Sequence, residues 1–380
     1  MLKLKFVVLF AIGLFLAPNF VHAQGEAAVP FLLVSPDSRA GGMGESGVGL
    51  ADNAAALYWN PAGLAYLRGS EVQLTHSNWL PQFHLDLFYD FLAYRQYIDD
   101  IDGTISAGVT FMNFGEFIRT GAGSSTPIGT FRSFDVAATV GYATKLTESI
   151  GLGFNFRVIH SRLSDKPTEQ EQGSGVATTI SFDIGAMYRP QELIIPLIGD
   201  MGDRVSFGAN LSNLGPKIYY IDQEQADPIP TNLRVGYAVR LFENDYNSLT
   251  LTNDFNKLLV TKHDSTTQAD PFYEAIFTSW KSIRQINFSV GLEYWYGEPS
   301  DFMFALRTGF FYEDPAYGNR KFATFGAGLR YDLYSFDFSY ISTSLVGGDI
   351  NHPLAQTLRF SLSMKWGEQH ETVRGFPRGI

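Results

Sequence analysis

The side chains that could act as acids, bases or metal ligands are scattered along this sequence. Its seven histidines do not show the H-E-x-x-H spacing of zinc hydrolases, and no G-x-S-x-G turn presents a serine nucleophile. The histidines are His22, His76, His84, His160, His263, His352 and His370. The sequence therefore predicts no catalytic residues and a protein that is not an enzyme.

Two further motifs could bind an ion or a phosphate group, but each also has a simpler structural explanation. Asp222, Glu224 and Asp227 lie close together and could bind a divalent cation through oxygen, but a solvated acidic loop is favoured. The glycines between positions 41 and 49 suggest a phosphate-binding loop, yet no Gly-Lys-Ser/Thr follows and no strand-like segment precedes them. Close packing of backbone is favoured there. We predict no metal site and no cofactor.

Composition narrows the class of protein. The chain has 28 basic and 39 acidic residues, and a net charge of −11 argues against binding to nucleic acid. It contains no cysteine, so disulfides cannot hold the fold together. Aromatic residues make up 15% of the chain and charged residues only 18%, a composition that suits strands facing lipid.

The first 23 residues have the pattern of a secretory signal peptide. Lys3 and Lys5 precede an apolar run, and Val21-His22-Ala23 supplies the small residues of a cleavage site. A transmembrane helix is the weaker alternative because the run is short and Pro18 interrupts it. Cleavage after residue 23 leaves 26 basic against 39 acidic residues, a net charge of −13.

Apolar and polar residues then alternate with a period of two, as in transmembrane β-strands. Residues 286–296 show this most clearly, with six large apolar residues on one face and Asn287, Ser289 and Glu293 on the other. The pattern predicts about 14 antiparallel strands: 71–79, 87–97, 103–114, 130–144, 149–161, 176–189, 203–212, 231–241, 247–256, 284–296, 301–312, 322–332, 334–342 and 357–366. A secreted β-sandwich is the soluble alternative, but the small and charged residues of the second face would make a poor core. We predict an all-β transmembrane barrel over residues 71–366.

Loop lengths support a barrel with short periplasmic turns and long external loops. Four long connections alternate with short ones: 115–129, 162–175, 213–230 and 257–283. The connection 190–202 is an exception, long where a short turn is expected. Apolar residues in the external loops are candidates for partner binding: Phe117, Ile118, Ile128, Ile218, Tyr219, Tyr220 and Ile276. Packing of loop on loop over the barrel mouth explains them equally well.

Residues 24–70 precede the first strand and are too long for a simple tether. Ala54, Ala55 and Ala56 favour a short helix that Asp52 or Asn53 could cap. Small residues suit an element packed inside a barrel of about 14 strands, which leaves interior space to fill. We therefore predict a hatch inside the lumen, held by a network of inward-facing charges: Arg157, Glu293, Arg307 and Arg330.

The motif Asn60-Pro61-Ala62-Gly63, within residues 35–67, resembles the N-terminal segment of the PorV family of type IX secretion proteins. That family lies within the wider FadL-like group of 14-stranded barrels, whose members carry an Asn-Pro-Ala hatch motif. The likeness extends through Phe114-Gly115-Glu116, Asn213-Leu214-Gly215 and residues 230–237. The paralogous PorQ group is the nearest alternative.

The resemblance implies a non-enzymatic protein in the outer membrane of a Gram-negative, Bacteroidetes-like cell. Family members are thought to collect exported substrates at the translocon through a C-terminal signal domain and to deliver them to the cell-surface sortase and attachment complex. The partners so implied are those proteins, the substrates and outer-membrane lipid, with no nucleic acid. Two other functions stay open: a FadL-like transporter of hydrophobic small molecules, and a purely structural or diffusive pore. Residues 367–380 are predicted to form a periplasmic C-terminal tail.

Overall fold

The computed structural model describes residues 27–120, 125–164, 175–196, 199–221, 223–261, 269–298, 302–346 and 352–367. The predicted signal peptide, residues 1–23, lies outside these ranges, as does nearly all of the predicted tail 367–380.

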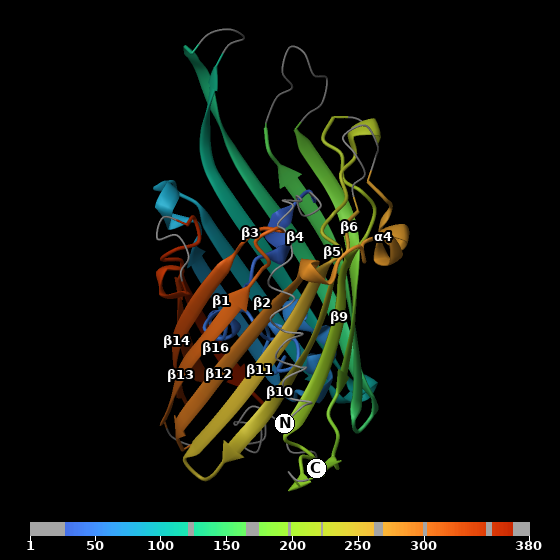
Figure 1. Cartoon of the computed structure of the whole chain (residues 1–380), viewed down its shortest axis with the longest axis vertical. Helices are drawn as coiled ribbons and strands as arrows, with labels where there is room; N and C mark the ends of the chain where they lie inside the picture. The colour runs from blue at the N-terminus through green and yellow to red at the C-terminus, as the bar shows by residue number, and fades with distance from the viewer. Residues whose placement is uncertain are drawn as a thin grey trace, which may run out of the picture.

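The described residues form a closed barrel of fourteen antiparallel strands (Figure 1). The strands are β1 (Ser70–Asn78), β2 (Phe88–Ile98), β3 (Gly103–Thr120), β4 (Pro127–Thr147), β5 (Ile150–Arg162), β6 (Val176–Tyr188), β9 (Val205–Leu214), β10 (Asn232–Glu243), β11 (Asn247–Leu258), β12 (Ile286–Gly297), β13 (Phe302–Tyr312), β14 (Lys321–Tyr331), β15 (Tyr334–Ser342) and β16 (Leu358–Trp366). Each strand pairs with its neighbour in sequence, and β1 closes the barrel against β16, with Ser70 opposite Trp366. The predicted fold class is confirmed.

The two faces of each strand meet different surroundings, which explains the period of two. Along β5, Phe154, Phe156 and Val158 are exposed on the outer face. Their inward neighbours Asn155 and Arg157 are buried. Because the exposed row is apolar and the buried row polar, the wall is inside out relative to a water-soluble protein and suits a lipid surround.

The connections differ in length between the two ends of the barrel. At one end the turns are short: β4 and β5 are separated by two residues, and β14 and β15 by two. The connection between β6 and β9 is longer because it folds into a small hairpin, β7 (Ile194–Ile195) with β8 (Gly199–Asp200). At the opposite end the connections are long, and β3 and β4 extend far beyond the rest of the wall (Figure 1).

The short helices are η1 (Pro30–Leu33), α2 (Ser38–Gly41), α3 (Ala56–Trp59), η2 (Pro61–Tyr66), η3 (Pro81–Phe83), η4 (Asp99–Ile101), η5 (Gln223–Gln225), α4 (Phe272–Thr278), η6 (Ile283–Gln285) and η7 (Ser344–Val346). Among the described residues, no helix has the length and apolar character needed to cross a membrane.

Residues 27–69, which we call the luminal segment, are surrounded by the wall (Figure 1). They carry the first four of these helices. Ala28 donates to the carbonyl of Pro228 in the long β9–β10 connection, whereas η2 packs on β4, β5 and β6 near the short-turn end. The segment therefore runs along the lumen from one end of the barrel to the other.

The alanine-rich helix was predicted to begin at Ala54, two residues too early. α3 begins at Ala56, its N-cap is Ala55, and no side chain caps it. Asp52 is not available as a cap because its carboxylate pairs with Arg39. Long-range ion pairing inside the lumen has overridden the local preference for a capped helix.

Candidate functional site

Asn60 links two parts of the luminal segment, at Val48 and at Ala62, to the barrel wall. Its side-chain amide donates to the carbonyl of Ala186 on β6 at 3.0 Å and to that of Val48 at 3.3 Å. Its Oδ1 accepts from the backbone N–H of Ala62 at 3.1 Å and so caps η2. An aspartate could accept but not donate, so only an amide at this position makes all three bonds.

Pro61 and the residues after it fit this cap. Pro61 occupies the first position of η2, where the absent N–H is not needed. Gly63 lies against the carbonyl of Ala51, and a Cβ there would overlap that oxygen. The predicted motif residues Asn60, Pro61, Ala62 and Gly63 are all buried. They form one compact turn seated on the inner wall, and its role as a hatch is taken up below as a proposal.

Inward glycines of the wall make room for this turn. A Cβ on Gly153 of β5 would overlap the backbone of Pro61, and one on Gly185 of β6 would overlap the side chain of Asn60. Gly208 of β9 lies equally close to the carbonyl of Val48. The wall and the segment therefore meet backbone to backbone, which only glycine permits.

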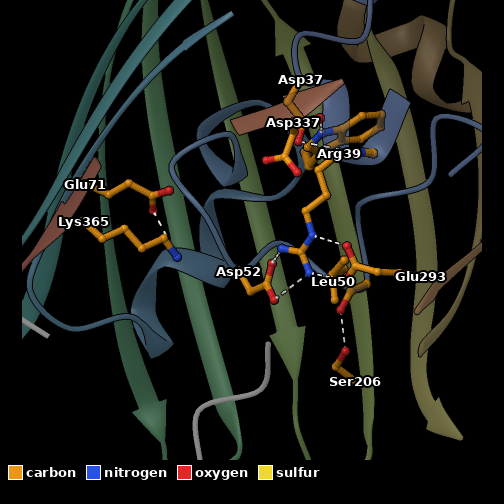
Figure 2. Close-up of polar contacts among 12 residues, drawn as sticks. Asp37, Arg39, Leu50, Asp52, Glu71, Ser206, Glu293, Asp337 and Lys365 are labelled. Carbon is orange, nitrogen blue, oxygen red and sulfur yellow. Dashed lines mark hydrogen bonds and ion pairs between the residues drawn. The ribbon is translucent and has the colours of Figure 1, made fainter. Parts of the chain in front are cut away.

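Arg39 is the centre of a buried ion-pair network (Figure 2). Its guanidinium contacts Asp52 within the segment at 2.5 Å and Glu293 of β12 at 2.6 Å. Glu293 also accepts from Arg307 of β13 at 2.7 Å, and Arg307 reaches Asp337 of β15 at 2.7 Å. One arginine of α2 is thereby tied to strands β12, β13 and β15 of the wall through alternating charges.

Asp37 anchors the same helix from the other side. It is the N-cap of α2, accepts from the backbone of Ala40 at 3.4 Å, and accepts from the indole of Trp59 at 2.9 Å. Burial raises the pKa of the Asp37 carboxyl above its ordinary value, although these hydrogen bonds and the charge of Arg39 act in the opposite direction. α2 and α3 are linked through this one carboxylate.

Further wall residues bind the backbone of the segment. Asp254 of β11 accepts from the N–H groups of Gly47 and Val48, at 2.7 and 3.0 Å. The hydroxyl of Ser361 on β16 accepts from the N–H of Ser38 at 3.0 Å. Thr324 of β14 accepts from Gly44 at 2.7 Å. Since irregular backbone inside a barrel must find partners for its polar groups, these contacts hold the segment without regular secondary structure.

The four inward charges named from the sequence have different roles. Glu293 contacts the luminal segment directly, and Arg307 supports Glu293. Arg157 instead pairs with Asp183 of β6 at 2.7 Å and contacts Asn213, which joins neighbouring strands of the wall. Arg330 lies 4.7 Å above the ring of Trp295. Sequence reasoning did not single out Arg39, because its barrel partner Glu293 lies 254 residues away in the chain. It also did not identify Asp37 as the link between α2 and Trp59.

A small cavity lies between the luminal segment and the wall. Its volume is about 80 Å³, and Tyr58 and Trp59 form part of its lining. The remaining lining combines the charged side chains Glu45, Arg234, Asp254 and Arg320 with the apolar side chains Leu33, Leu258 and Phe311. An apolar ligand the size of benzene occupies an apolar cavity of about 150 Å³. This cavity is smaller, and its charged side chains make it unlike the apolar cavity that holds benzene.

A second candidate surface lies outside the barrel, on the extension of β3 and β4. The register of β2 with β3 ends at Phe88 opposite Asn113, and that of β5 with β4 ends at Arg162 opposite Phe134. Beyond these pairs, the described part of β3 and β4 is a two-stranded ribbon. Ile118 and Ile128 are 65% and 64% exposed on it, and Phe117 is also exposed.

The ribbon corrects the predicted loop 115–129. The third strand was predicted to end just before Gly115. Gly115 instead has a φ of +82° and forms a bulge, after which pairing resumes with Glu116 opposite Arg132. The stacked rings of Phe117 and Phe131, 5.5 Å apart, stabilise the extension. The three candidate residues Phe117, Ile118 and Ile128 therefore lie on strands of the ribbon. Phe117 pairs with Phe131, whereas its neighbour Ile118 projects from the opposite face of the ribbon.

Ile218 was wrongly predicted to be an exposed partner-binding residue. It is only 2% exposed, pairs with Asp227 across an isolated bridge, and packs in the core cluster that contains Phe31. The 213–230 connection folds over the barrel mouth, where it meets the start of the luminal segment. Loop packing, the alternative interpretation, applies here.

Of the remaining loop candidates, some are exposed like the ribbon residues and some are partly buried. Tyr220 is half-buried and donates to the hydroxyl of Ser161 at 2.8 Å, whereas Tyr219 is exposed. Ile276 is half-buried on α4. The ribbon, and not the 213–230 connection, thus carries most of the exposed candidates.

The acidic residues considered for a cation are not a site in the described part of the chain. Asp222 lies outside the described residues. Among the described residues, no group of three or more potential metal ligands comes together.

Comparison with known proteins identifies relatives at two levels. The family model for "Type IX secretion system protein PorV" matches residues 22–265. Among the curated proteins compared with the chain, none matches.

Solved structures with some similarity to this chain include two toluene transporters and a FadL homologue. The toluene transporter TodX of P. putida has a TM-score of 0.51 and 11% identity, covering 88% of this chain and 100% of that one. The toluene transporter TbuX of Ralstonia pickettii has a TM-score of 0.47 and 12% identity, covering 87% and 99%. A FadL homologue of Pseudomonas aeruginosa has a TM-score of 0.47 and 12% identity, covering 90% and 99%. At these identities the likeness to TodX shows the fold and nothing about ligands.

Proposed function

This chain belongs to the PorV family of type IX secretion system proteins, and we propose that it binds exported substrates through their C-terminal signal domain. It then delivers them from the translocon to the cell-surface sortase and attachment complex. The protein is an integral outer-membrane barrel. The binding and delivery steps are the proposal.

The observation that carries the proposal is the exposed ribbon of β3 and β4. Phe117, Ile118 and Ile128 are apolar side chains held on rigid strands at the end of the barrel that has the long connections. They lie on both faces of the ribbon, and exposed apolar residues gathered on one projecting element are typical of interaction sites. The described ladders of β3 with β2 and of β4 with β5 end before the ribbon begins, and a β-rich signal domain could add a strand there.

The luminal segment has a separate role in this proposal, as a hatch that closes the barrel. Its predicted extent is residues 24–70, with the barrel at 71–366. The contacts of Asn60, Arg39 and Asp254 fix it to the wall at several heights. A closed lumen suits a protein whose partners act at its external surface.

The experiment compares two triple variants of equal apolar loss. Phe117→Ser, Ile118→Ser and Ile128→Ser remove the ribbon surface. Phe83→Ser, Leu85→Ser and Leu345→Ser remove exposed apolar residues from other connections at the same end. We expect the first variant, recovered from outer membranes as a folded barrel, to co-purify at least tenfold less substrate carrying the signal domain than the wild type.

The control variant is expected to retain substrate. Both variants are checked for folding by heat-dependent migration in gels, since a folded barrel migrates differently from an unfolded chain. Wild-type recovery of substrate by the folded ribbon variant would exclude the ribbon as the binding surface.

The FadL-like transport of hydrophobic small molecules finds no support in the cavity. That function needs an apolar pocket of ligand size beside Asn60. The cavity described above is small, is partly lined by charged side chains, and does not include Asn60 in its lining. Likeness to toluene transporters extends to the fold alone.

A further inference from the structure

α4 and the turn that follows it present an unusual apolar surface on the outside of the barrel. α4 lies beyond the edge of the wall and well below the tips of β3 and β4 (Figure 1). Phe277 is 78% exposed and Ile283 is 73% exposed, and Tyr273 and Trp280 are more than half exposed. Four large apolar or aromatic residues within eleven positions therefore meet something other than protein in this chain.

The spacing of these residues places an exposed apolar stripe and a buried side on different faces of α4. Tyr273, Phe277 and Trp280 follow the i, i+4, i+7 rule, and Ser279 keeps helical backbone angles between the last two. Ala275 and Ser279 are buried on the side that faces the protein. Thr278 fastens the helix by hydrogen bonds to Asp270 and Thr261. The exposed apolar stripe thus has a fixed orientation and cannot simply turn inward.

The height of this stripe follows from β12, which begins directly after η6. Its outward residues run from Tyr296 to Ile286, ten steps that at about 3.4 Å each and a tilt of about 40° rise about 26 Å along the membrane normal. The apolar band of an outer-membrane barrel is about 25 Å tall. Ile283 therefore lies at the upper boundary of the band, continuous with the lipid-facing wall.

Trp280 is suited to that boundary. Its indole N–H donates to the carbonyl of Ile276 at 2.7 Å, so the polar group that would otherwise seek water is already satisfied within α4. Lys281 and Glu274 are exposed and lie to one side of the stripe. An amphipathic segment with a satisfied indole and flanking charges has the character of an interfacial anchor.

We propose that α4 lies on the outer membrane surface and inserts Tyr273, Phe277, Trp280 and Ile283 into the outer-leaflet lipid. The occupant of this surface is lipid because the stripe continues the lipid-facing wall at the height where that wall ends. This anchor is independent of substrate binding by the ribbon.

The test exploits the absence of cysteine from the chain. Phe277→Cys and Glu274→Cys place a single environment-sensitive NBD fluorophore on the apolar and polar sides of the same helix. Ile118→Cys places it on the ribbon. The labelled full-length barrels are reconstituted in bilayers of phosphatidylcholine, with acyl chains either brominated or not.

We expect bromine to reduce emission at position 277 at least twofold, with little effect at 274 and none at 118. Equal quenching at 277 and 274 would overturn the proposed orientation, and no quenching at 277 in a folded barrel would overturn the anchor itself. In the second case, a blue shift at 277 on adding the protein partners would identify a protein as the occupant. The quenching measurement does not depend on substrate recovery by the ribbon variants. The proposal for α4 and the proposal for the ribbon can therefore be disproved separately.

Discussion

At the scale of single residues, the interior of this barrel depends on polar groups with long-range partners. Arg39 is buried and its charge is balanced by Asp52 and Glu293, while Arg307 meets Glu293 from the other side. A buried ion pair adds little when complete, because removing its charges from water offsets their attraction. Breaking one is costly, because the remaining charge keeps the burial and loses its partner.

We therefore expect Arg39→Met to loosen the luminal segment. The change leaves Asp52 without its arginine and Glu293 with Arg307 alone, at a cost of about 3–5 kcal/mol in the free energy that holds the segment in place. Hydrogen–deuterium exchange of residues 38–59 in the folded barrel should become faster.

The control is Arg132→Met, which removes an exposed arginine from the ribbon. It should leave exchange in residues 38–59 unchanged. Equal protection in wild type and Arg39→Met would mean that Arg39 does not hold the segment.

Individual residues could be predicted from the sequence where their partners or their strand pattern are local in the chain. Asn60 and Pro61 were identified because their turn is local, and Glu293 and Arg307 because charge on the inward face of a strand is unusual. Arg39 and its partner Glu293 are 254 residues apart, so no spacing rule connects them. Arg39, Asp37 and Asp52 are charged residues in a segment otherwise rich in small residues, and that contrast was the one available signal.

At the scale of elements, the strands were predictable because lipid outside and polar groups inside enforce a period of two over each crossing. The elements that sequence reasoning missed are those without this two-sided environment. The ribbon beyond Asn113 faces water on both sides, so its alternation no longer reports a membrane crossing. The 213–230 connection has no period, and the burial of Ile218 depends on contacts with the luminal segment.

The close approach of η2 to β5 and β6 leads to a prediction about Gly185. Gly185→Ala would place a Cβ 2.9 and 3.0 Å from the ring carbons of Pro61 and closer still to Asn60. Since the hydrogen-bonded amide oxygen of Asn60 and the fixed ring of Pro61 leave little room to adjust, we expect a cost of about 1–3 kcal/mol. Protease susceptibility of residues 60–66 in the folded barrel should rise.

Ala186→Val is the matched control, because Ala186 is the next residue of β6 and is exposed on the outer face. It adds a larger group to the same strand without approaching η2. If both variants release the segment equally, the effect belongs to β6 and not to its contact with Asn60 and Pro61.

At the scale of the whole molecule, the luminal segment and the external ribbon separate two ways in which the protein could work. A transporter of small molecules would need the segment to move so that a path opens through the lumen. A shuttle that holds its cargo on the ribbon needs only the outer surface and lateral movement in the membrane. Fixing the segment to the wall therefore distinguishes the two.

Ser38 and Ser361 offer the position for such a lock, because their hydroxyl oxygens lie 3.0 Å apart, between α2 and β16. In a chain with no other cysteine, Ser38→Cys with Ser361→Cys should form a single disulfide on oxidation, after small side-chain adjustments. We expect the locked barrel to support secretion of signal-domain substrates at the wild-type level, since the proposed delivery does not pass through the lumen. Each single-cysteine variant controls for the substitutions, and gel migration under non-reducing conditions shows that the bond has formed. Loss of secretion on oxidation of the double variant alone, restored by a reductant, would instead show that the segment must move and would favour passage through the barrel.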